Sequence, residues 1–185
     1  MPRLHEQWTE KYGAEPDEKA VETIYGAFED SLMRSLEQYA APKPDVVETV
    51  AKLREMGLKI GSTTGYTDKM MAVVTENAAK QGYAPDAWFS PDSVDGLGRP
   101  NPYMIFANMR KFQVPSVQAV VKVGDTVSDI REDRNAGVCS LGVLEGSSVM
   151  GMTQTAYEAL SAEKSRPHLT VRGRCSSRPA PMMCC

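Results

Sequence analysis

Two helical segments are predicted before residue 40. Apolar residues spaced three and four apart indicate a short helix near Leu4–Tyr12 and a long helix from about Asp17 to Tyr39. The long helix follows a Glu-Pro-Asp start signal at residues 15–17. These two segments form a helical hairpin, which is too small to be a complete domain.

From residue 42 the pattern changes to helices that alternate with short apolar strands. The predicted strands are 58–63, 87–90, 119–123 and 140–144, and the predicted helices lie between Asp45 and Gly57 and over 68–81, 103–112 and 128–136. The first of these helices has a predicted buried face of Val46, Val47, Val50 and Leu53. Such alternation is typical of right-handed βαβ crossovers. The expected fold class is α/β, a Rossmann-like parallel sheet with helices on both faces.

Charge is distributed unevenly along the chain. The formal net charge of −3 divides into −7 for residues 1–160 and +4 for residues 161–185. An acidic body argues against nucleic acid as a partner, because such binding uses many Lys and Arg contacts to phosphate. No apolar run is long enough to cross a membrane, and residues 1–13 lack a secretory signal, so a cytoplasmic protein is expected.

Residues 161–185 follow neither a helical nor a strand period. This segment contains three of the four cysteines and is rich in Arg, Ser and Pro. Its cysteine spacing matches no zinc site, and a disulfide framework is not indicated. We expect a disordered tail or the product of a reading-frame slip.

Two carboxylates follow the strand that ends at Val123. Asp125 leaves the strand and Asp129 lies in the first turn of the next helix, so both face the same edge of the sheet. Oxygen ligands of this kind suit Mg²⁺. The alternative is structural: Asp125 caps the helix and Asp129 favours its positive end.

The other strand ends carry donors for an anion. Ser62-Thr63-Thr64-Gly65 offers hydroxyl and backbone donors where the next helix begins, although Thr67 could simply cap that helix. Arg99 stands in a proline-stiffened loop and can neutralise a phosphate, although alone it reads as a solvated surface residue.

The combination of three segments resembles a known family. The segments are KIGSTTGYT (59–67), GRPNPYM (98–104) and KVGDTVSDIREDRNAGV (122–138). Together they are similar to the phosphonatase (phosphonoacetaldehyde hydrolase) branch of the haloacid dehalogenase superfamily. The likeness extends from about Met1 to Leu160.

The resemblance implies a Mg²⁺-dependent hydrolase that cleaves the carbon–phosphorus bond of phosphonoacetaldehyde, giving acetaldehyde and phosphate in phosphonate catabolism. Thr64, Gly65 and Arg99 would bind phosphate, with Thr64 and Arg99 catalytic. Asp125 would ligate Mg²⁺, with Thr126 and Asp129 supporting it.

The chain also departs from the family pattern. The DxAGTT loop with its nucleophilic Asp, and the cap lysine that forms a Schiff base, match no segment here. Residues 1–40 are then expected to be a partial helical cap, 41–160 a core without its first, central strand, and 161–185 an aberrant tail. The chain as given is expected to be inactive.

Other readings stay open beside the phosphonatase one. A non-catalytic phosphate-binding or dimerising phosphonatase-like protein is the first alternative. Another phosphatase of the superfamily, such as one acting on phosphoglycolate, is the second. The resemblance implies a small-molecule phosphonate as partner and a homodimer through the cap helices.

Overall fold

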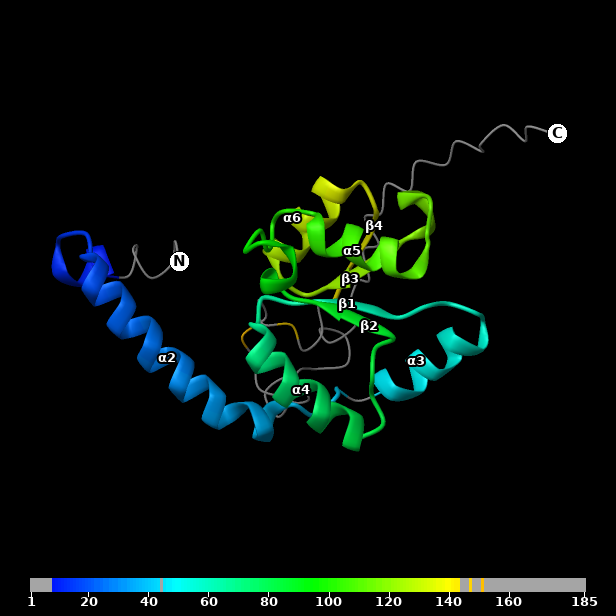
Figure 1. Cartoon of the computed structure of the whole chain (residues 1–185), viewed down its shortest axis with the longest axis horizontal. Helices are drawn as coiled ribbons and strands as arrows, with labels where there is room; N and C mark the ends of the chain where they lie inside the picture. Colours follow the sequence, from blue (N-terminus) through cyan, green and yellow to red (C-terminus); the bar gives the residue numbers. More distant parts are fainter. Residues whose placement is uncertain (1–7, 44, 144–146, 148–150, 152–185) are drawn as a thin grey trace, which may run out of the picture. The chain divides into compact units, whose positions relative to one another are not determined.

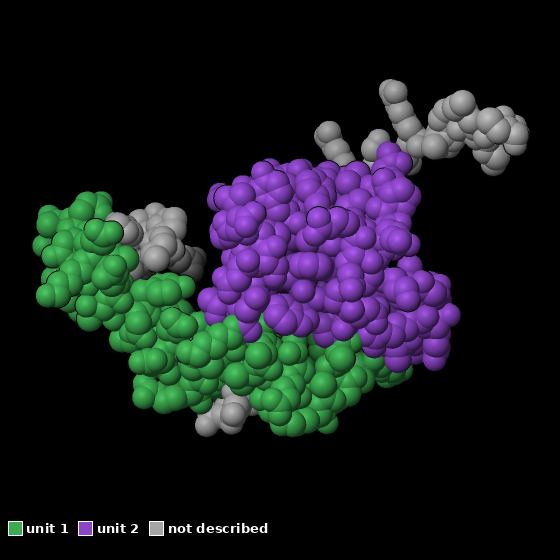
Figure 2. All heavy atoms as spheres, in the orientation of Figure 1, with its two compact units in different colours: residues 1–49, 69–84 green, residues 50–68, 85–185 purple. Residues whose placement is uncertain are grey.

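The computed structural model describes residues 8–43 and 45–143, together with Ser147 and Gly151 (Figure 1). Contacts divide the chain into two compact units. One unit contains residues 1–49 and 69–84, and the other contains residues 50–68 and 85–185 (Figure 2). The predicted tail of residues 161–185 and the start of the first predicted helix lie outside the described residues.

The long predicted helix is present as α2 (Glu18–Tyr39), and Asp17 caps it by accepting a 2.7 Å hydrogen bond from the Ala20 amide. Its apolar stripe is only partly covered, since Leu36 is buried whereas Phe28 is 57% exposed. No described helix is both long and apolar enough to cross a membrane.

Helix α3 (Val46–Glu55) forms where it was predicted, but its expected apolar face is not buried. Val47 is 38% exposed, and no residue of this helix is buried. The apolar spacing determines which face could be covered, whereas burial depends on an element that packs against that face. Helix α4 (Asp68–Lys80) differs in this respect, because it buries Met70, Met71 and Ala78.

The strands of the second unit pair in parallel, as predicted. β1 (Gly61–Thr63) pairs with β2 (Ala87–Phe89), and β3 (Val121–Gly124) pairs with β4 (Cys139–Gly142). Among the described residues these strands form two separate two-stranded sheets, β1–β2 and β3–β4. β1 and β3 each have a single strand neighbour there, so each presents an unpaired edge.

Two helices pack on these sheets. α5 (Tyr103–Phe112) contacts β1 and β2, α6 (Val127–Ala136) contacts β3 and β4, and the two helices contact each other. The Asn108 side chain of α5 donates a 3.1 Å hydrogen bond to the Ser62 carbonyl of β1. This bond fixes the helix against the strand that leads into the Thr64–Gly65 loop.

The most deeply buried large side chains are mainly polar. They are Met104, Glu132, Asp133 and Ser90. Burying a carboxylate costs free energy unless it is paired or hydrogen-bonded, so a core of this kind is poorly suited to maximising stability. Its polar members lie on α6 and directly after β2, close in the chain to the segments that the sequence predicts to be functional.

Candidate functional site

The first part of the site is the loop that follows β1. The Thr64 amide donates to the Phe89 carbonyl at 3.3 Å, and the Thr64 hydroxyl accepts a 3.0 Å hydrogen bond from the Tyr66 amide. The Thr64 side chain therefore already stabilises the turn. Gly65 comes next and is exposed, which leaves its backbone accessible to an anion.

Arg99 lies against this loop. A Cβ atom placed on Gly65 would be 3.5 Å from Arg99 Nη2, so the guanidinium lies next to the glycine. Arg99 Nη1 also donates to the Asp129 carboxylate, and the Arg99 side chain is only 19% exposed. Arg99 is therefore held in place between two segments and is not a solvated surface residue.

Asp129 is the centre of the group. Its Oδ1 receives Arg99 and, at 3.0 Å, the Lys122 ammonium, while its Oδ2 accepts from the Thr126 amide at 3.1 Å and hydroxyl at 2.5 Å. Burial by itself raises the pKa of Asp129, but hydrogen bonds from Thr126 and Lys122 and the nearby positive charges outweigh it and lower the pKa to about 2. Asp129 is an anion with both oxygens engaged.

The structural alternative for the paired aspartates is partly wrong. The cap of α6 is Thr126, whose hydroxyl accepts from the Asp129 amide at 3.1 Å while the Asp129 carboxylate binds the Thr126 backbone in return. This reciprocal arrangement is a capping box with Asp129 at its third position. Asp125 does not cap the helix; it is half-buried and stands immediately before Thr126.

The contacts join Gly65, Arg99, Thr126 and Asp129 into one group, and chain position adds Thr64 and Asp125 to it. The described residues contain no cluster of three or more His, Cys, Asp or Glu side chains that could hold a metal ion. Mg²⁺ often takes one or two carboxylates and completes its shell with water and phosphate. Asp125 fits such a site as its protein ligand, whereas the engaged Asp129 fits only as support.

Sequence reasoning missed the buried residues behind the site. Lys122 of β3 also lies 3.5 Å from Glu132 Oε2, and that oxygen accepts a 3.0 Å hydrogen bond from the Thr63 hydroxyl. Asp133 accepts a 2.5 Å hydrogen bond from Ser140. The sequence does contain a pattern that indicates these residues. Lys122 interrupts a run of valines, and Glu132 and Asp133 follow Asp129 by three and four residues, which places them on the same face of a helix.

The pKa values of these buried carboxylates shift in the opposite direction to that of Asp129. Burial raises the pKa of Glu132 against the opposing influence of Lys122 and Thr63, and burial raises the pKa of Asp133 against its bond to Ser140. Glu132 Oε1 and Asp133 Oδ1 have no hydrogen-bond partner among the described residues. The two groups are thus less fully satisfied than Asp129.

The loops after β1 and β2 are also tied together. The Ser90 hydroxyl donates to Asp68 Oδ1 at 2.5 Å and accepts from the Asp92 amide at 3.1 Å. Asp92 in turn accepts from the Asp68 amide at 2.8 Å. This exchange of caps fixes the far end of the loop that carries Thr64 and Gly65.

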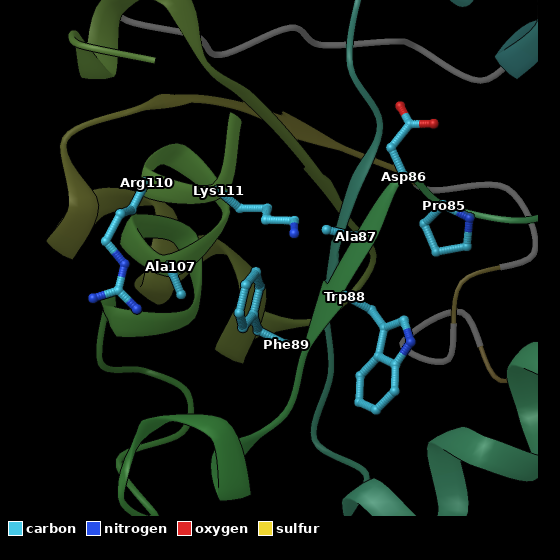
Figure 3. Close-up of a pocket in the computed structure, with 8 residues that line it drawn as sticks. All are labelled: Pro85, Asp86, Ala87, Trp88, Phe89, Ala107, Arg110 and Lys111. Carbon is cyan, nitrogen blue, oxygen red and sulfur yellow. The ribbon is translucent and has the colours of Figure 1, made fainter. Parts of the chain in front are cut away.

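A cavity beside β2 and α5 is a separate feature. Its volume is about 710 Å³, and it lies beside β2 and α5, where Phe89, Ala107 and Lys111 contribute to its wall (Figure 3). None of the six predicted site residues, all of which the structure describes, lines it. The candidate site is therefore distinct from this cavity.

Comparison with known proteins identifies the family. A family model described as a haloacid dehalogenase-like hydrolase matches residues 3–137. The chain belongs to this hydrolase family. Its α/β fold with parallel strands agrees with a phosphonoacetaldehyde hydrolase-like protein from Oleispira antarctica, at a TM-score of 0.76 and 29% identity over 88% of this chain and 59% of that one.

Curated relatives confirm the resemblance to phosphonoacetaldehyde hydrolases. The enzyme of that name from Lysinibacillus sphaericus is 49% identical over 90% of this chain, and the one from Bacillus cereus is 43% identical over 92%. The chain spans 62% and 64% of the lengths of these relatives.

Proposed function

We propose that this protein is a phosphonoacetaldehyde hydrolase whose second unit binds the phosphoryl group of the substrate. One observation carries the proposal: Arg99 lies next to Gly65 after β1 and pairs with Asp129 after β3, so donors from separate segments lie close together. Relatives with that activity, at 49% and 43% identity, support the choice of substrate.

The chemistry of the group fits a phosphoryl ligand. Backbone donors at Thr64 and Gly65, together with the fixed guanidinium of Arg99, would bind the phosphoryl oxygens by charge-assisted hydrogen bonds. Asp129 holds Arg99 in place before the substrate arrives, which lowers the cost of organising the site. The reaction would break the carbon–phosphorus bond of phosphonoacetaldehyde with water and release acetaldehyde and phosphate.

Asp125 would hold Mg²⁺, with Thr126 and Asp129 fixing the turn on which it stands. When bound, Mg²⁺ would neutralise charge on the phosphoryl oxygens. Because Asp125 is half-buried and follows directly from β3, its backbone is anchored by the β3–β4 ladder.

The unpaired edges of β1 and β3 fit a core whose central strand lies between them, as the family resemblance implies. In that family the strand leads to the nucleophilic Asp, and a cap lysine forms a Schiff base with the aldehyde. We assign neither role to any of these 185 residues. Loss of an attacking group costs on the order of 10⁶ in kcat, so the chain alone should show no turnover.

The test is a chimera. A segment carrying the DxAGTT loop and cap lysine of the Lysinibacillus sphaericus relative is fused ahead of this chain, and acetaldehyde release from phosphonoacetaldehyde is measured with Mg²⁺. The chimera should turn over and should be trapped by borohydride, whereas the 185-residue chain should do neither. Arg99→Ala in the chimera should remove most of the activity, and Arg110→Ala, an exposed arginine on α5, should not.

Other outcomes would overturn the proposal. A folded chimera that hydrolyses phosphoglycolate without borohydride trapping would favour a different phosphatase of the family. Phosphate binding by the chimera without any hydrolysis would favour a phosphate-binding protein.

The proposal extends to partners and compartment. The substrate is a small cytoplasmic phosphonate, and α2 provides an exposed apolar stripe that suits a homodimer of the kind the resemblance implies. Sedimentation of the chimera tests the dimer, which Phe28→Glu should dissociate if α2 forms the interface.

A further inference from the structure

Glu132 occupies an unusual place beside the site. It lies on α6, three residues after Asp129, so the two carboxylates project from the same face of the helix. Its side chain is completely buried. A single oxygen, Oε2, receives both the Thr63 hydroxyl at 3.0 Å and the Lys122 ammonium at 3.5 Å.

These contacts form a continuous chain of side chains. Thr63 is the last residue of β1 and is bonded to Glu132; Glu132 is paired with Lys122 of β3; and Lys122 is bonded to Asp129 at 3.0 Å. Among the described strands, β1 and β3 exchange no ladder hydrogen bonds. Side chains must therefore provide part of the link that a continuous sheet would provide through its backbone.

Thr63 directly precedes the Thr64–Gly65 loop, so its hydrogen bond to Glu132 affects where that loop lies. The next two residues are Thr64 and Gly65, which must face Arg99 for both to meet one phosphate. A shift of about 1 Å in such a group can cost a hundredfold in rate. A buried carboxylate that holds Thr63 is thus well placed to set the loop.

We propose that Glu132 is a positioning residue. Its carboxylate binds both Thr63 and Lys122 and so fixes the Thr64–Gly65 loop against Arg99 and Asp129. The identity of the ligand, a phosphoryl group, rests on the proposed function. The placement of the loop does not, and it can be measured without any ligand.

The main comparison uses Glu132→Gln and Asp133→Asn. Both replace a fully buried carboxylate on α6 by its amide, but Asp133 bonds Ser140 and not Thr63. Backbone amide resonances of Thr64 and Gly65 are recorded without ligand, and inorganic phosphate is then titrated in the presence of Mg²⁺. Glu132→Gln should shift these resonances and weaken phosphate binding about tenfold, because its neutral amide loses the ion pair with Lys122 and accepts a weaker hydrogen bond from Thr63. Asp133→Asn should do neither.

A second pair tests the route through Thr63 and remains useful if Glu132→Gln does not fold. Thr63→Val removes the hydroxyl at nearly constant volume, whereas Thr63→Ser keeps it. Thr63→Val should reproduce the loop shift and the affinity loss, and Thr63→Ser should restore wild-type values. In the double variant, Thr63→Val should add little to Glu132→Gln, because both substitutions act on the same contact between Thr63 and residue 132.

The outcomes separate the two proposals. Unchanged Thr64 and Gly65 resonances in Glu132→Gln and Thr63→Val would overturn the positioning role. Equal shifts in Asp133→Asn would show general loosening of α6 and would also overturn it. Shifted resonances with no phosphate binding by the wild-type chain would support the positioning role and reject the proposed function.

Discussion

At the scale of single residues, three carboxylates on one helix have different electrostatic environments. Asp129 is surrounded by Lys122, Arg99 and the Thr126 cap, which lower its pKa. Glu132 and Asp133 are buried with fewer donors, and burial raises the pKa of each. The same helix therefore contains one group whose ionised form the fold stabilises and two whose ionised form burial disfavours.

Because of Asp129, the free energy of unfolding should decrease as the pH falls through the acid range. Its folded pKa of about 2 lies below its ordinary value of 3.8, so its contribution is present above pH 3.8 and is lost as the pH falls through 2. The difference corresponds to about 2 kcal/mol. Asp129→Asn should lower the free energy of unfolding at pH 6 by about 3–5 kcal/mol, because Arg99 loses its counter-ion and Lys122 keeps only Glu132 among the residues described.

Urea unfolding of wild type and Asp129→Asn between pH 6 and pH 2 measures this effect. The gap between the two proteins should narrow towards pH 2. A gap that stays constant over this range would contradict the role of Asp129 as a buried anion.

Asp133→Asn should have the opposite sign. A folded pKa above the ordinary 3.8 means that the folded state favours the protonated form, so ionisation at neutral pH opposes folding. Removing the charge should therefore raise the unfolding free energy at pH 7. The gain should shrink at pH 3, where Asp133 is protonated in wild type. Thermal midpoints at the two pH values test this, and a loss of stability at pH 7 would contradict it.

At the scale of elements, glycines on the strands make room for the polar groups. A Cβ on Gly124 would lie 2.4 Å from Asp129 Cβ and 2.7 Å from its Cγ, a distance that no packed structure allows. The first turn of α6 can therefore lie against β3 only where β3 has a glycine. Gly142 is its register partner on β4, and a Cβ there would meet Ile130 Cδ1 at 4.0 Å.

Gly124→Ala and Gly142→Ala form a matched pair. Gly124→Ala should cost about 1–3 kcal/mol, because α6 must move away from β3, and it should weaken phosphate binding by displacing Asp129. Gly142→Ala should stay within about 0.5 kcal/mol of wild type. Urea unfolding and phosphate titration measure both, and equal effects would show that the Gly124 contact is not specific.

Sequence pattern predicted helices better than strands, for a physical reason. α5 runs over Tyr103–Phe112 as predicted, because local spacing and end signals define a helix. The predicted strand 58–63 is shortened to Gly61–Thr63, since a strand exists only where a partner supplies the ladder. In the same way, Arg99 and Asp129 were predicted from motifs, whereas Lys122 and Glu132 were missed because their burial depends on partners far along the chain.

At the scale of the whole molecule, the chain has two compact units whose cores differ in kind. The first unit buries apolar residues such as Leu36 and Met70, and the second buries Met104 beside Glu132 and Asp133. Val121 and Val123 of β3 are 61% and 52% exposed, so the second unit leaves apolar strand surface uncovered in the described chain. Because its core contains buried carboxylates, the second unit should be less stable than the first.

The two tryptophans allow each unit to be followed separately. Trp8 lies in the first unit and Trp88 in the second, and the chain contains no others. In urea, the Trp8→Phe variant, which reports through Trp88, should unfold at a lower midpoint than the Trp88→Phe variant, which reports through Trp8.

Met104→Ala truncates a fully buried side chain of the second unit. It should lower the free energy of unfolding that Trp88 reports by about 2–5 kcal/mol and leave the transition that Trp8 reports unchanged. Val121→Ala, at an exposed position, controls for truncation and should change neither by more than about 0.5 kcal/mol. If the Trp8 and Trp88 transitions coincide and Met104→Ala shifts both equally, the chain unfolds as one cooperative body. The buried carboxylates would then lower the stability of both units.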